Sequence, residues 1–97
     1  MMPAGRYFAC TLPSGIVLWD TAFNPLSFLA GLGFPHACDC WEVSREAYEA
    51  RERAILARQP RPTAAQVAAM LQATGRRVAA IDAEGRLTEL TDGARPQ

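Results

Sequence analysis

The pattern of hydrophobic and polar positions predicts strands at both ends of the chain. Residues 6–12 and 16–19 are rich in aromatic and β-branched side chains, and the turn residues 13–15 between them predict a hairpin. Residues 36–43 alternate in polarity, which predicts a third strand. Near the other end, residues 77–82 and 86–90 flank Asp82 and Gly85, which suit the first and fourth positions of a type I turn. We therefore expect a second hairpin there.

Two helices are predicted between the third strand and the second hairpin. Ser44 is a good N-cap for a helix that runs to about residue 58, before Pro60 and Pro62. Thr63 and Gln66 have the spacing of a capping box, which predicts a second helix over residues 64–74. The segment 20–35 is expected to be a loop with one short helical turn around residues 26–30.

The order of these elements predicts an α+β fold: an N-terminal β-hairpin plus a third strand, two consecutive helices, and a C-terminal β-hairpin. The length of 97 residues suits one small domain. We expect this domain to span residues 5–91 and to be followed by a flexible polar tail at residues 92–97.

Charge and hydropathy exclude several classes of partner. Ten basic and ten acidic residues give no net charge, which argues against nucleic acid or an anionic membrane as the main partner. The longest apolar stretch, residues 25–35, is too short to cross a membrane as a helix. All the basic residues are arginine and alanine is abundant, a bias typical of a GC-rich bacterial or phage genome. No export signal is evident, so we expect a cytosolic protein with reduced thiols.

The residues with the sharpest local chemistry are three cysteines and a histidine. On a strand, His36, Cys38 and Cys40 would share one face, and Cys10 would complete a Cys₃His set for tetrahedral zinc. However, alternate positions on a flat strand lie about 6–7 Å apart, farther than two ligands of one zinc ion allow without a kink. The sequence therefore favours buried free thiols and no cofactor, with a zinc-stabilised module as an open alternative.

No catalytic arrangement stands out in the sequence. A cysteine nucleophile needs a nearby base, and His36 is the only imidazole, with nothing to mark an oxyanion hole or an orienting third residue. Asp20 and Asp39 are acidic but carry no spacing that pairs them. We therefore expect a protein without enzymatic activity.

Aromatic residues are concentrated in the first half of the chain, within an uncharged segment that contains glycine and proline. Such residues form the core of a small domain, and on a loop they also serve as anchors in protein interfaces. We expect partner binding to involve this segment. The candidate partner-binding residues are Trp19, Phe23, Phe28, Leu29, Phe34 and Trp41.

Two stretches of the sequence resemble a known family. The first runs from Pro35 through Trp41 to Tyr48, and the second runs from Gly75 to Leu87. They are similar to motifs in the short tail-fibre assembly proteins of tailed bacteriophages, which also begin with an aromatic hairpin like the one around Tyr7. The resemblance covers about half of the chain.

This resemblance implies a non-enzymatic chaperone that helps a phage fibre protein to fold and trimerise. It would act in the host bacterial cytoplasm, and in some systems such proteins stay in the virion. One alternative is a small phage-encoded inhibitor or accessory protein that binds a host protein. In both cases the expected partner is another protein, and self-association is left open.

Overall fold

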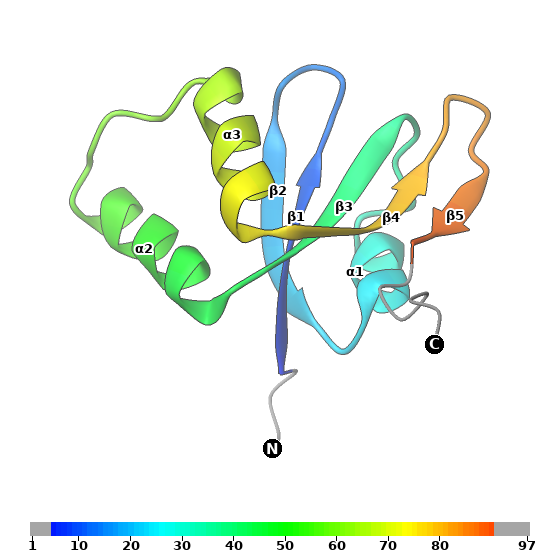
Figure 1. The fold of residues 1–97 in the computed structure, drawn as a ribbon, viewed down its shortest axis with the longest axis horizontal. Coiled ribbons are helices and arrows are strands. Elements are labelled where there is room, and N and C mark those ends of the chain that lie inside the picture. The colour runs from blue at the N-terminus through cyan, green and yellow to red at the C-terminus, as the bar shows by residue number, and fades with distance from the viewer. Residues whose placement is uncertain (1–4, 91–97) are drawn as a thin grey trace.

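A computed structural model describes residues 5–90 of the chain, which form one antiparallel sheet and three helices (Figure 1). The elements in chain order are β1 (Arg6–Thr11), β2 (Val17–Ala22), α1 (Pro25–Gly31), β3 (Cys38–Val43), α2 (Arg45–Leu56), α3 (Ala64–Thr74), β4 (Arg76–Ile81) and β5 (Leu87–Glu89). The predicted α+β class and the predicted order of elements are confirmed. The predicted tail at residues 92–97 lies outside the described residues.

The five strands have the spatial order β2-β1-β3-β4-β5, so β2 and β5 form the two edges of the sheet. Every neighbouring pair of strands is antiparallel. The register of β3 and β4 shifts between Cys40 and Trp41, where Val78 is the extra residue of a bulge. The long connection through α2 and α3 lets β4 return to the sheet beside β3.

Both hairpins close with the same turn. In the first, Gly15 N donates to Leu12 O at 2.9 Å and Leu12 N donates to Ile16 O at 2.9 Å. Gly15 has a φ of 91°, in the left-handed region that glycine adopts without strain. This is a type I turn followed by a bulge. The second hairpin repeats it, with Gly85 at a φ of 85° and bonded to Asp82 O.

The sheet has a separate hydrophobic core on each face. On one face, α1 packs its buried residues Phe28 and Leu29 against Phe8 and Cys10 of β1. The rings of Phe8 and Phe28 stack with their centroids 5.4 Å apart. The opposite face is covered by α2 and α3 and has its own core. The buried members of this second core are Ala9, Val43, Val67 and Leu71.

Side-chain caps define where the helices begin. The Ser44 Oγ accepts a bond from Ala47 N at 3.1 Å, as predicted for α2. Thr63 and Gln66 form the predicted capping box of α3. A second capping box, between Asn24 and Ser27, starts α1. The predicted single turn at residues 26–30 is therefore a seven-residue helix with its own cap.

Three predicted boundaries are wrong. Strand β2 runs to Ala22, so residues 20–22 belong to the strand and not to the predicted loop. Helix α2 ends at Leu56, before residue 58, because Arg58 takes a left-handed φ of 57° and turns the chain away. The third strand begins at Cys38 and does not include His36. Ala37 has a φ of 57°, outside the range of extended backbone, so the strand alternation does not reach His36.

Candidate functional site

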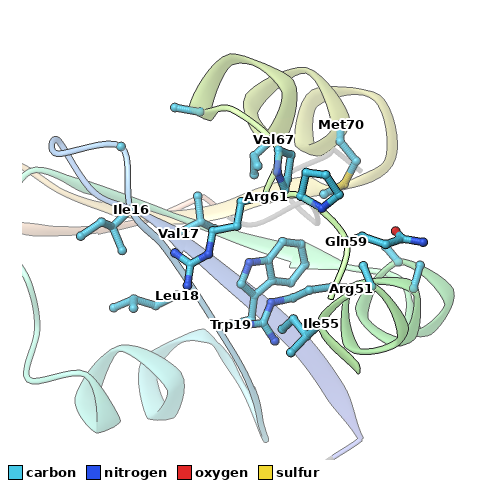
Figure 2. A pocket seen from close by; sticks show the side chains of 17 residues that line it. Ile16, Val17, Leu18, Trp19, Arg51, Ile55, Gln59, Arg61, Val67 and Met70 are labelled. Atoms are coloured by element: carbon cyan, nitrogen blue, oxygen red, sulfur yellow. The ribbon is translucent and has the colours of Figure 1, made fainter. Parts of the chain in front are cut away.

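A groove of about 810 Å³ lies on the face covered by α2 and α3. Its walls come from the first hairpin and β2 at residues 15–19, from α2 between Ala47 and Ile55, from the connection 59–62, and from α3 between Ala64 and Met70. Figure 2 shows the lining side chains around Trp19. The volume lies in the range of typical ligand pockets, so the groove can hold several side chains of a partner.

The groove exists because α2 packs only lightly on the sheet. This helix has no fully buried residue, whereas α3 buries Val67 and Leu71. Its groove-facing positions Ala47, Ala50 and Ala54 have short side chains, which leave space between the helix and the sheet. Two prolines at positions 60 and 62 stiffen the connection that closes the far side.

The lining is apolar with two positive charges. Arg51 and Arg61 are the charged residues of the lining, Gln59 adds an amide, and no acidic side chain takes part. The Arg51 guanidinium lies over the Trp19 ring, 5.4 Å from its centroid, and also contacts Glu52 at 3.2 Å. Within the described part of the chain, Arg61 makes no ion pair. The groove is therefore suited to an apolar ligand that carries a negative group.

Of the predicted partner-binding residues, Trp19 lines the groove. Trp41 lies on the same face of the sheet, half-buried, and its indole N–H donates to Thr11 Oγ1 at 3.4 Å. Phe28 and Leu29 are buried in the core on the opposite face and expose almost no surface to a partner. The six residues therefore do not form one surface.

Phe23 and Phe34, the remaining two of the six, are 69% and 43% exposed. They flank α1 in the sequence, and α1 covers the face opposite the groove.

Sequence analysis missed the aliphatic part of the groove. Ile16 and Ile55 line it and are each 55% exposed. Ala47, Tyr48, Ala54 and Ile55 form an apolar stripe along α2, and their helical spacing predicts burial of Ile55 against the core. The light packing of α2 leaves this side chain uncovered, and nothing in the sequence of the helix alone indicates that.

The three cysteines lie together in the core beneath α1. Cys10 and Cys40 are direct partners in the register of β1 and β3, and all three thiols belong to the same buried cluster. The Cys38 thiol donates to Pro35 O at 3.1 Å. Burial, with the neighbouring Cys38 thiol, raises the pKa of Cys40 to about 12, and the same causes raise the pKa of Cys10 further. Both groups are therefore held as neutral thiols, which are poor nucleophiles.

The fourth member of the candidate zinc set lies elsewhere. His36 is exposed, outside the strand, and its imidazole lies against Gly85 in the second hairpin, so close that a Cβ at Gly85 would come within 3.0 Å of Nε2. Among residues 5–90, no group of three or more His, Cys, Asp or Glu side chains is placed to hold a metal ion. The predicted sharing of one strand face by His36, Cys38 and Cys40 is wrong, because the strand starts after Ala37.

The two acidic residues considered as a pair also lie apart. Asp20 is opposite Phe8 in the register, whereas Asp39 is opposite Thr11. Directly opposed residues share a face, and successive residues of β1 point to opposite faces. Phe8 and Thr11 are three positions apart, so the two carboxylates project from opposite faces of the sheet. Asp39 lies 3.5 Å from the Arg77 guanidinium.

Comparisons with protein families, with curated proteins and with solved structures found no match for this chain. No helix within the described residues is long and apolar enough to cross a membrane.

Proposed function

We propose that this chain is a non-enzymatic protein-binding module whose partner docks in the groove between β2, α2 and α3. The observation that carries the proposal is the lining of this groove: exposed aliphatic side chains beside Trp19, with two arginines and no acidic residue. Exposed apolar surface costs free energy in water, and a concave patch of this kind with a polar rim is typical of an interaction site.

The proposed partner is a phage tail-fibre protein, which the chain would help to fold and assemble. Support for this comes from the resemblance around Trp41 to Tyr48 and around Gly75 to Leu87, together with the neutral charge of the chain. A stoichiometric inhibitor or accessory protein that binds a host protein would use the same groove. The two functions differ in the partner and not in the mode of docking.

The test is co-expression of the chain with a phage tail-fibre protein, followed by affinity capture. Two exposed residues give matched variants: Ile55→Glu places a charge in the groove, and Phe23→Glu places the same charge beside α1. Both variants should keep the fold, because both side chains are largely exposed. We expect the wild type and Phe23→Glu to capture the fibre protein, and Ile55→Glu to lose it.

Other outcomes of this experiment would contradict the proposal. Loss of capture by Phe23→Glu with normal capture by Ile55→Glu would place the docking surface at α1 and not in the groove. Failure of the wild type to capture the fibre protein would refute the tail-fibre function. Circular dichroism of each variant confirms that any loss is not caused by unfolding.

A further inference from the structure

The outer edge of β2 is an unpaired strand edge in the sheet of residues 5–90. The turn bond from Leu12 N to Ile16 O shows which residues of β2 point their backbone groups towards β1. In an antiparallel pair, hydrogen-bonded and non-hydrogen-bonded positions alternate. Residues 16, 18, 20 and 22 therefore bond to β1, and the N–H and C=O groups of residues 17, 19 and 21 point outwards.

One of these three positions is already occupied. The Thr21 N–H donates to the Asp20 carboxylate at 2.8 Å, which caps the edge at that point. A charged residue at such a place discourages strand pairing. The backbone groups of Val17 and Trp19 remain, and both residues line the groove. The open part of the edge and the apolar groove thus coincide.

We propose that the groove receives an extended segment of the partner protein, which pairs with β2 at Val17 and Trp19 as a sixth strand. This inference rests on the proposed function and specifies the chemistry of the partner. Alternate side chains of the segment would enter the groove beside Trp19 and Ile55, and an acidic side chain would meet Arg51 and Arg61. Backbone bonds supply affinity in this mode of binding, and the side-chain pockets supply specificity.

The charges of the groove support an acidic segment. Two guanidinium groups and no carboxylate line a largely apolar space, so a partner carboxylate would find two cations there and no competing negative charge. Arg51 is partly neutralised by Glu52, whereas Arg61 has no ion-pair partner within residues 5–90. We therefore assign the larger part of this recognition to Arg61.

The shape of the site favours a single segment over a second copy of this chain. The connection between α2 and α3 extends beyond the β2 edge (Figure 1), and its residues 59–62 form the far wall of the groove. One extended segment fits between this connection and β2. An extended segment is one strand wide and needs a spacing of about 4.8 Å from β2, which is less clearance beside the connection than a second five-stranded sheet would need.

The probe for this proposal is a yeast-displayed library of random linear twelve-residue peptides, selected against the full-length chain. Selected peptides are synthesised with blocked ends and titrated by calorimetry. We expect them to combine an acidic residue with alternating β-branched or aromatic residues. A strand bonds its neighbour through alternate amides only, so N-methylation of one alternate set should abolish binding, and N-methylation of the other set should not.

Matched variants of the protein test the charge. Arg61→Glu should weaken binding of the selected peptide at least about tenfold. Arg86→Glu makes the same charge change in the second hairpin, at the other end of the sheet, and should leave the dissociation constant unchanged. Replacement of the acidic residue of the peptide by its amide should reproduce the loss caused by Arg61→Glu.

Three results would overturn the proposal: no binder in the library, equal binding by both N-methylated series, or equal affinity of Arg61→Glu and the wild type. These results are separable from failure of the proposed function. If the fibre protein is captured by the wild type and lost with Ile55→Glu, docking in the groove stands even where strand addition is refuted.

Discussion

The carboxylate of Glu42 bridges two arginines that come from the strands on either side of β3. Arg6 of β1 donates from Nε and Nη2 at 3.0 and 2.8 Å, and Arg76 of β4 donates from Nη2 at 2.8 Å. The hydrogen bonds from Arg6, with the charges of both arginines, hold the pKa of Glu42 below its ordinary value. We therefore expect Glu42→Gln to lower the free energy of unfolding at neutral pH.

The size of the loss follows from the exposure of the bridge. An exposed ion pair contributes about 0.2–1 kcal/mol, and a hydrogen bond to a charged group contributes about 1.5–3 kcal/mol where it is buried. The Glu42 side chain is 20% exposed, but its partners are more exposed than that. We expect a loss of about 1–2 kcal/mol. Glu49→Gln removes an exposed pair with Arg45 within α2 and serves as the control, with a smaller effect.

The effect should depend on pH, with a definite sign. The pKa of Glu42 is lower in the folded state than the ordinary value of 4.5. The contribution of Glu42 to the free energy of unfolding is therefore complete above pH 4.5, and it is lost as the pH falls through the pKa of the folded state. Urea denaturation followed by circular dichroism should show a constant difference between wild type and Glu42→Gln near neutral pH, and a shrinking one below about pH 4.5. Equal stability at neutral pH, or a difference that does not change with pH, would refute the bridge.

Three further predictions concern the α3 cap, the zinc content and the thiols. Thr63→Ala removes the bond from Gln66 N to Thr63 Oγ1, 3.1 Å long, and should lower the free energy of unfolding in urea by about 0.5–2 kcal/mol; an unchanged value would contradict the cap. EDTA should leave the thermal melting of the protein unchanged, with less than one zinc ion per chain by elemental analysis. The buried thiols of Cys10, Cys38 and Cys40 should react with Ellman's reagent only on unfolding. One zinc ion per chain that EDTA removes together with the fold would contradict the zinc prediction.

The sequence predicted the elements whose chemistry is local. A capping box joins residues three apart, as in Thr63 and Gln66, and a hairpin turn needs glycine where φ is positive, as at Gly15 and Gly85. These contacts form between neighbours in the chain, so short sequence windows contain all the information that they need. The order of elements and the α+β class followed from them.

The sequence failed where a regular period was interrupted. The alternation of residues 36–43 predicted that His36 shares a strand face with Cys38. The left-handed backbone of Ala37, which lies between these two residues, ends the strand before His36. No side-chain pattern marked this break, because alanine is seldom found at a positive φ. The three cysteines came together as neighbours on one face of the sheet, and the histidine did not.

The sequence by itself determined the two hairpin turns and the caps of α2 and α3, because each depends on residues a few positions apart. Only the tertiary structure decided that β2 is an edge strand, that Glu42 bridges Arg6 and Arg76, and that α2 rests on the sheet without a buried residue. The physical reason is that these features depend on how residues distant in sequence pack. The apolar stripe of α2 predicts a buried face, but the amount of that face that is covered depends on the sheet beneath it. The groove beside Trp19 is the part that stays uncovered.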